Sequence, residues 1–254
     1  PPIILALAKH PAVEGRDLSA LHLIMSGAAP LDAAIEAAAA ARVGCVVTQG
    51  YGMTEASPVT HATSDKPGSA RPGSVGPLVS NTEGRIVDPA TGVDVEPGTD
   101  GELLVRGPQV MRGYLNNPEA TAATVDVEGW LHTGAIARVD ADGYFSIIDR
   151  VKELIKVKGY QVPPAELEAV LIGHPSVADA AVIPVPDEEC GEVPKAFVVL
   201  SQPIDSDALM AYVAERVSPY KRIREVEVVD AIPKSTSGKI LRRVLIDQER
   251  AARA

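Results

Sequence analysis

A lysine near the end of the chain lies in a setting suited to anionic ligands. Lys239 follows a run of small and polar residues, 233–238, and precedes an apolar run at helical spacing. Such a turn can hold an ammonium group beside anionic oxygens without burying it unpaired. The phosphate-loop (Walker) pattern does not fit, because Pro233 stands where its first glycine is required and Ile240 where a Ser or Thr should follow the lysine. Lys239 is therefore a candidate anion-binding residue of another kind.

The segment 49–55, which reads Gln-Gly-Tyr-Gly-Met-Thr-Glu, combines glycines with a hydroxyl and a carboxylate just after a predicted strand. Glycines allow backbone amides to approach a ligand closely. Thr54 offers a hydroxyl to a phosphate oxygen, and Glu55 offers a carboxylate to Mg²⁺. Taken alone, the segment fits a glycine turn with a solvated acid better than a nucleotide site, because short motifs often match by chance.

Positive charge gathers in segment 149–160 of an otherwise acidic chain. Arg150, Lys152, Lys156 and Lys158 fall within it, whereas the whole chain carries a formal net charge of -10. By itself this pattern is explained equally well by a solvated charged face and by a binding face.

Taken together and in this order, the three segments resemble the signatures of acyl-adenylate-forming enzymes, most closely 4-coumarate/cinnamate–CoA ligases and their luciferase relatives. The segments 26–31, 111–116 and 130–134 look like further signatures of the same family. Trp130 is equally explained as a core aromatic residue, and His132 is better explained as a structural hydrogen-bonding residue than as a base. The resemblance extends over essentially the whole chain.

The resemblance implies roles in nucleotide binding. Residues that would contact AMP or ATP are Gln49, Gly50, Thr54, Arg150 and Lys239, with Glu55 on Mg²⁺. Lys239 would bridge the substrate carboxylate and the α-phosphate. Positive charge at that point stabilises a pentavalent transition state, in which charge builds on the equatorial oxygens.

The resemblance also implies sites for the acyl group and for CoA. The acyl pocket would be lined by Ala28, Gly52 and Val59. The acyl-adenylate would be contacted by Lys152 and Lys156, and CoA by Lys158 and Gly159. Asp149 would be the hinge about which a small domain turns, and Gln161 belongs to the same matched stretch without an assigned partner.

One position departs from the family pattern. The family continues Thr-Gly-Asp, with the Asp on the ribose hydroxyls, but this chain reads Thr133-Gly134-Ala135. A methyl group cannot accept those hydrogen bonds, and their loss costs roughly 1.5–3 kcal/mol, or about ten- to a hundredfold in affinity. Asp140 and Asp142 lie in the next turn and do not match the position. Either nucleotide binding is weaker, another group substitutes, or the alanine was introduced.

The pattern of elements predicts two parts of different fold. A strand at 21–27, a helix over 32–41 capped by Asp32 and a strand at 43–48 that ends in a turn at 49–52 give the rhythm of an α/β sheet, whose ligands gather at the carboxyl ends of the strands. Frequent Gly and Pro between short apolar runs predict small antiparallel β structure over 65–148.

Beyond Arg150 the pattern predicts a compact α+β module. Its predicted elements are a helix opened by Pro163-Pro164, strands at 177–185, 195–200 and 225–229, a helix at 205–217 and a final helix from about Ile240. We therefore predict α/β and α+β folds in two parts. Residues 1–149 would be the C-terminal part of a large AMP-binding domain, and residues 150–254 a small domain that carries Lys239.

Composition restricts the partners. A sequence pI of about 5.0 disfavours a nucleic-acid-binding surface, and no apolar run approaches the ~20 residues needed to span a bilayer. Cys45 and Cys190 lack metal-ligand spacing and predict reduced thiols in a cytoplasmic protein. The phosphate-gripping loop of these ligases is not found in the chain, since 63–69 resembles it only superficially and comes in the wrong order. The N-terminal half of the same enzyme is thus an expected partner.

The resemblance implies an ATP-dependent acid–CoA ligase that converts a carboxylate to acyl-AMP and then to acyl-CoA. The expected co-substrates are ATP and CoA, the expected metal is Mg²⁺, and a small carboxylic acid of cinnamate or coumarate type is the first expectation for the substrate. Two alternatives remain: a fatty-acid–CoA ligase, and an inactive or degenerate fragment that binds nucleotide or CoA.

Overall fold

The computed structural model describes residues 1–66, 68–236 and 238–253. It divides into two compact units, Pro1–Val151 and Lys152–Ala254. The break thus falls between residues 151 and 152, where the sequence predicted it between 149 and 150.

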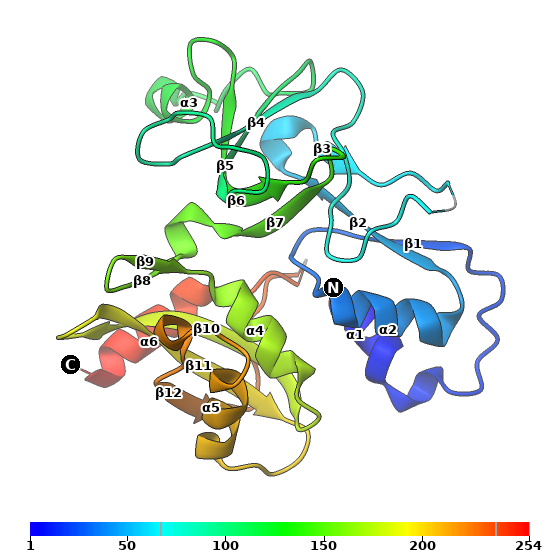
Figure 1. The fold of residues 1–254 in the computed structure, drawn as a ribbon, viewed down its shortest axis with the longest axis vertical. Coiled ribbons are helices and arrows are strands. Elements are labelled where there is room, and N and C mark those ends of the chain that lie inside the picture. Colours follow the sequence, from blue (N-terminus) through cyan, green and yellow to red (C-terminus); the bar gives the residue numbers. More distant parts are fainter. Residues whose placement is uncertain (67, 237, 254) are drawn as a thin grey trace. The chain divides into compact units, whose positions relative to one another are not determined.

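The first unit begins with an α/β layer (Figure 1). Its elements are α1 (Pro2–Lys9), β1 (Leu23–Ser26), α2 (Ala33–Val43), β2 (Val46–Gly52) and β3 (Val59–Ala62). The strands β1 and β2 are parallel, with Leu23 opposite Val46 and Ser26 opposite Gln49, and β3 pairs antiparallel with β2. The Asp32 carboxylate caps α2 by accepting from the amide of Ala34 at 2.9 Å, which confirms the predicted cap.

The predicted turn at 49–52 is wrong, because β2 continues through these residues to Gly52. Pairing with β3 extends the strand, since Gly50 lies opposite Ala62 and Gly52 opposite Val59. The chain instead turns after Met53, in the 3-10 helix Thr54–Ala56. The glycines had suggested a turn, but a long-range strand partner decided the local structure.

The rest of the first unit is an antiparallel sheet of strands β4 (Glu83–Val87), β5 (Gly101–Arg106), β6 (Leu131–Val139) and β7 (Phe145–Arg150), in that order. The short helix α3 (Pro118–Thr124) lies between β5 and β6 in sequence. The buried core of this sheet includes Leu103, Val105, Leu131 and Phe145. The sheet agrees with the antiparallel β structure expected for this stretch.

The second unit is a mixed sheet covered by helices. Its elements are β8 (Ile155–Val157), β9 (Tyr160–Val162), α4 (Pro164–Gly173), β10 (Val177–Asp187), β11 (Gly191–Leu200), α5 (Ser206–Ala214), β12 (Glu225–Val228) and α6 (Arg242–Arg253). The strand order is β10-β11-β8-β9, with β12 parallel to β11.

Alternation along β10 explains how the helices are arranged on that sheet. Ala180 and Val182 belong to the apolar cluster formed with α4 and α5, whereas Ala181 and Ile183 belong to the one that contains Leu245 of α6. Successive side chains of a strand point to opposite faces, so α4 and α5 cover one face and α6 the other. The two units together confirm the predicted α/β and α+β fold class.

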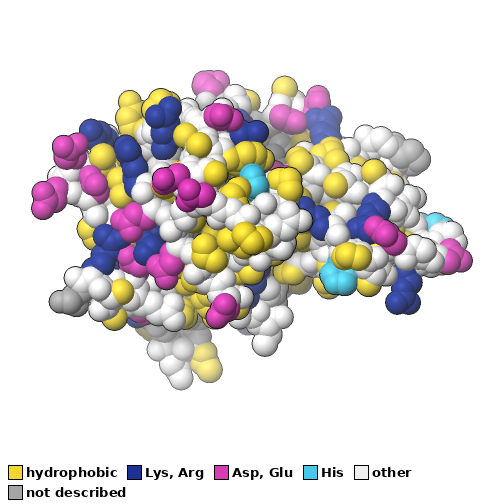
Figure 2. Space-filling model, turned by 90° about the horizontal axis from the view of Figure 1, so that it is seen from below, with side chains coloured by type: hydrophobic (Ala, Val, Ile, Leu, Met, Phe, Trp, Pro, Cys, Tyr) yellow, Lys and Arg dark blue, Asp and Glu magenta, His cyan; other side chains and the backbone are white. Residues whose placement is uncertain are grey.

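Figure 2 shows acidic and basic side chains intermixed on one face of the molecule. The whole chain carries a formal net charge of -10. No helix in the described part of the chain is long and apolar enough to cross a membrane.

Candidate functional site

The loop after β1 and the end of β2 bring together the residues predicted to bind nucleotide and acyl group. Parallel pairing of Ser26 with Gln49 places the carboxyl ends of both strands at one edge, where ligands of such sheets gather. Ala28 follows β1 with a φ of 73°, an uncommon value for a residue with a side chain. Gly52 and Val59 are neighbours across the β2–β3 pair, and all three predicted acyl-pocket residues are exposed.

Gly52 has a packing reason that needs no ligand. A Cβ built on it would lie 1.9 Å from the carbonyl oxygen of Pro58, and the same oxygen accepts from the amide of Met53 at 2.7 Å. Only glycine tolerates this approach. An acyl group at Gly52 stays a prediction.

The side chain of Gln49 points into the protein. It is 5% exposed, and its Nε2 donates to Glu36 Oε2 at 2.7 Å and to the carbonyl of Leu31 at 3.0 Å. Burial raises the pKa of the Glu36 carboxyl, which also accepts from the amide of Gly73 at 3.1 Å. This network links β2 to α2 and engages the Gln49 side-chain nitrogen inside the protein, while a contact between Gln49 and AMP stays a prediction.

Glu55, the predicted metal ligand, is held by a residue that the sequence did not pair with it. The hydroxyl of Tyr114 donates to Glu55 Oε1 at 2.7 Å, and the amide of Met111 donates to the Glu55 carbonyl at 2.7 Å. The hydrogen bond to Glu55, together with burial, raises the pKa of Tyr114. The only sequence signal was that Tyr114 lies in the conspicuous segment 111–116.

The site has one carboxylate suited to Mg²⁺. The described residues contain no group of three or more His, Cys, Asp and Glu side chains that could hold a metal ion. Mg²⁺ in nucleotide sites commonly uses one or two carboxylates together with substrate phosphates and water. Glu55 Oε2 makes no hydrogen bond within the described part of the chain, and Thr54 beside it is exposed. These groups therefore fit a metal ion that arrives with ATP.

Ala135 lies in β6, opposite Arg150 of β7, and is only 3% exposed. Its amide donates to the Thr133 hydroxyl at 3.1 Å. Asp140 and Asp142 each form a 2.8 Å ion pair with Arg71. These two carboxylates are thus engaged elsewhere, and neither takes the place of the missing Asp.

Arg150 and Asp149 end β7 of the first unit. The Asp149 carboxylate is 4% exposed and accepts from the amide of Arg150 at 2.7 Å, whereas the Arg150 side chain is exposed. The exposed guanidinium agrees with a ligand-binding role, which stays a prediction, as does the hinge at Asp149.

The second unit presents Lys239 on a closed, exposed turn. Lys234 and Ile240 form an antiparallel bridge, the amide of Ser235 donates to the Lys239 carbonyl at 2.9 Å, and the Lys239 amide donates to Ser235 Oγ at 3.1 Å. Lys239 itself is exposed. Ser237 of the motif lies outside the described residues.

Lys158 and Gly159 form the two-residue turn of the β8–β9 hairpin, which sequence analysis did not predict. Their φ values of 50° and 86° match a type I′ turn, which needs positive φ at both positions. The amide of Lys158 donates to the Cys190 carbonyl at 2.8 Å. The predicted ligand residues on this hairpin and just before it are all exposed: Lys152, Lys156, Lys158, Gly159 and Gln161.

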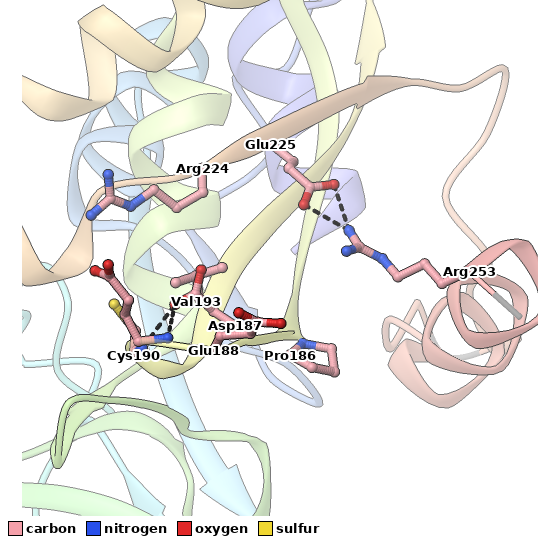
Figure 3. A pocket seen from close by; sticks show the side chains of 9 residues that line it. Pro186, Asp187, Glu188, Cys190, Val193, Arg224, Glu225 and Arg253 are labelled. Carbon is pink, nitrogen blue, oxygen red and sulfur yellow. Dashed lines mark hydrogen bonds and ion pairs between the residues drawn. The ribbon is translucent and has the colours of Figure 1, made fainter.

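A pocket of about 480 Å³ lies in the second unit near the β10–β11 turn (Figure 3). The Asp187 carboxylate there accepts from the amide of Cys190 at 2.7 Å, and Arg253 forms a double hydrogen bond with Glu225 at 2.6 and 2.7 Å. None of the predicted site residues lines this pocket, and two of its charged residues, Arg253 and Glu225, are paired with each other.

Two family models match the chain: "AMP-binding enzyme" over residues 1–115 and "AMP-binding enzyme C-terminal domain" over residues 166–239. The chain belongs to the acyl-adenylate-forming enzymes. It is 54% identical over 251 residues to 4-coumarate–CoA ligase 2 of Oryza sativa and 53% identical to 4-coumarate-CoA ligase 2 of Narcissus pseudonarcissus. Each match covers 96% of this chain and 44% of the relative.

Solved structures of the family agree in fold. The anthranilate CoA ligase AuaEII in complex with anthranoyl-AMP has a TM-score of 0.89 and 34% identity, covering 99% of this chain and 50% of that one. The o-succinylbenzoate CoA synthetase of Bacillus subtilis with its acyl-adenylate intermediate has a TM-score of 0.84 and 33% identity, covering 94% and 49%. The chain therefore spans about half the length of the relatives it matches.

Proposed function

We propose that the chain serves an ATP-dependent acid–CoA ligase acting on a cinnamate- or coumarate-like acid. The observation that carries this proposal is the 54% identity, sustained over 251 residues, with a 4-coumarate–CoA ligase. The geometry supports it, because the end of β2 presents Thr54 and Glu55 at a strand edge and a closed turn exposes Lys239. The two free cysteines, Cys45 and Cys190, support a reducing compartment such as the cytoplasm.

In the proposed reaction, a carboxylate oxygen of the acid attacks the α-phosphorus of ATP and pyrophosphate leaves. The CoA thiol then attacks the carbonyl carbon of the acyl-AMP, and AMP leaves. Lys239 would stabilise charge on the phosphate oxygens in the first step. Lys158 and Gly159 would position CoA in the second step, after the second unit has turned about Asp149. No covalent nucleophile is required, so positioning and electrostatics supply the catalysis.

Mg²⁺ bound with ATP would neutralise phosphate charge as pyrophosphate departs. Glu55 would bind the ion through Oε2 while Oε1 stays bonded to Tyr114. Second-shell hydrogen bonds of this kind orient metal ligands. Arg150 would contact the ribose, with no carboxylate at position 135 to share that task.

The alanine at position 135 favours a second candidate, a module that binds nucleotide or CoA without catalysis. Calorimetry with AMP and with CoA distinguishes binding from its absence. A module of this kind would bind one of them and form no acyl-AMP.

The test joins this chain to the part of the Oryza sativa ligase that lies outside the match. Such a partner is required because Leu23, Met25 and Val46 are 38%, 56% and 44% exposed, although parallel strands are usually covered on both faces. The hybrid is assayed for ATP–pyrophosphate exchange with cinnamate, coumarate and fatty acids. Lys239→Ala should reduce exchange by at least about a hundredfold. The matched control is Lys66→Ala at another exposed lysine, and exchange retained in the Lys239 variant refutes the assignment.

A further inference from the structure

Arg242, three residues after Lys239, makes a dense set of contacts in the second unit. Its Nη2 donates to both oxygens of Glu168 at 2.7 and 2.8 Å, its Nη1 contacts Glu153, and its Nε donates to the carbonyl of Val182 at 3.3 Å. The Arg242 side chain is 13% exposed and that of Glu168 is 8% exposed. One guanidinium thus connects α6 with α4, with β10 and with Glu153, the last residue of the 3-10 helix Val151–Glu153.

The position of this arginine is unfavourable for the helix alone. Arg242 is the first residue of α6, and the first turn of α6 contains no acidic residue. A cation at a helix N-terminus opposes the helix dipole, and desolvation of a guanidinium adds a further cost. The two hydrogen bonds from Nη2 to the Glu168 carboxylate offset both, because hydrogen bonds between an ionised donor and an ionised acceptor are the stronger class. The arginine at this position is therefore explained by its contacts with α4, β10 and Glu153, and not by a favourable effect on α6.

Two chain segments, 233–235 and 239–241, pair with each other on either side of the turn that carries Lys239, and we call them its stems. The contacts of Arg242 hold the second stem in place. On the other stem, Lys234 forms a 2.6 Å ion pair with Asp179 of β10. Between the stems, the amide of Leu241 donates to the Pro233 carbonyl at 2.8 Å. Both stems are anchored to the body of the unit, whereas Lys239 stays exposed between them.

We propose that Arg242 is a positioning residue for Lys239, and that its contacts with Glu168, Glu153 and the Val182 carbonyl fix the exit of the lysine turn. The catalytic consequence rests on the proposed function of Lys239. The anchoring itself does not, since it is a property of the second unit. Through Glu153, four residues after Asp149, the same guanidinium also holds the start of that unit.

The first arm of the test measures backbone amide hydrogen exchange in the chain itself. Arg242→Gln should speed exchange of the Ser235 and Leu241 amides by about tenfold or more, while amides in the centre of β11 keep their rates. Arg243→Gln is the matched control, because it removes the same charge from the adjacent residue, whose side chain is 94% exposed. Unchanged exchange in the turn overturns the proposal, as does an equal acceleration in the turn and in β11.

Arg242→Lys keeps the charge, but a single ammonium group cannot replace three nitrogens that contact Glu168, Glu153 and the Val182 carbonyl, so it tests the geometry if the glutamine variant fails to fold. It should give intermediate exchange in the turn. Wild-type exchange in this variant would show that charge alone suffices and would overturn the role of the guanidinium contacts.

The second arm uses the hybrid enzyme. Arg242→Lys should lower kcat for acyl-AMP formation by about tenfold, leave the KM for ATP nearly unchanged, and leave thioester formation from supplied acyl-AMP intact. Equal losses in both half-reactions overturn the positioning role. If Lys239→Ala keeps full activity, the proposed function fails, while the exchange experiment still decides whether Arg242 anchors the turn.

Discussion

His61, on β3 beside the edge predicted to bind nucleotide, should make the first unit sensitive to acid. The ring is 0% exposed and lies between Phe145, at 4.5 Å, and Tyr51, at 5.9 Å between ring centroids. The Thr60 hydroxyl donates to the Tyr51 carbonyl at 3.2 Å, so the 2.9 Å contact with His61 is best satisfied by Nδ1–H donating to Thr60. Nε2 has no hydrogen-bond partner in the described part of the chain. A proton added there would place an unpaired charge in an apolar site.

Burial lowers the pKa of His61 from 6.5 to about 3. Since the unfolded chain takes up a proton near pH 6.5 and the folded one does not, the stabilising contribution is complete above pH 6.5 and is lost as the pH falls toward 3. Each pH unit in this window costs about 1.4 kcal/mol. About 2 kcal/mol should be lost by pH 5, and on the order of 5 kcal/mol in total.

The measurement is urea unfolding followed by the fluorescence of Trp130. It is the only tryptophan of the chain, it is 6% exposed, and it lies in the first unit. His61→Leu is the reference variant, because leucine cannot be protonated and suits the apolar surroundings. The unfolding free energy of the wild type minus that of the variant should fall by about 2 kcal/mol from pH 7 to pH 5. A difference that does not change with pH would refute the reasoning, as would a histidine NMR signal of His61 titrating near pH 6.5.

Three further predictions concern the binding edge and the second unit. Ala135→Asp should raise AMP affinity in calorimetry by about tenfold, if the added carboxylate reaches the ribose, and should lower the melting temperature because the position is 3% exposed. Tyr114→Phe removes the donor that orients Glu55, so the Mg²⁺ concentration for half-maximal adenylation in the hybrid should rise by about tenfold, and an unchanged requirement would contradict the fit. Glu249→Gln removes the negative charge 2.6 Å from the buried Lys195 ammonium and should cost about 1–3 kcal/mol, measured by thermal unfolding followed by circular dichroism. A loss below ~0.5 kcal/mol would show that Glu225 and Glu227, which also pair with Lys195, are enough to compensate its charge.

Sequence patterns correctly predicted the elements that depend on interactions between residues near each other in the chain. Asp32 caps α2 as expected, and the strand predicted at 177–185 is present as β10, Val177–Asp187. Long-range pairing decided the failures. β2 continues through two glycines because β3 lies against it, and the hairpin at Lys158-Gly159 lacks the usual Asn-Gly signal.

The candidate site divides in the same way. Residue types and order, together with the family resemblance, predict roles for Glu55 and Lys239, because the chemistry of phosphate and metal restricts the residues that can serve; these roles stay predictions. Their supporting residues were invisible, since Tyr114 is 59 positions from Glu55 and Arg242 is 89 positions from Glu153. Sequence reasoning gave Gln49 a role in binding AMP, which stays a prediction, and it did not show that the buried side chain links β2 to α2. Contacts between residues so far apart depend on the fold and not on spacing.

These contacts suggest how the proposed reaction is organised. Glu55 is oriented by Tyr114 and the Lys239 turn is anchored at both stems, so each unit fixes its own reactive groups through bonds within that unit. Preorganised groups stabilise a transition state without the cost of reorienting at the moment of reaction. The proposed chemistry would use predicted groups of both units, Thr54 and Glu55 of the first and Lys239 of the second. If each unit fixes its own groups, what can change between adenylation and thioester formation is the placement of one unit relative to the other. Substitutions at Asp149, the predicted hinge, should therefore alter the rates of the two half-reactions unequally.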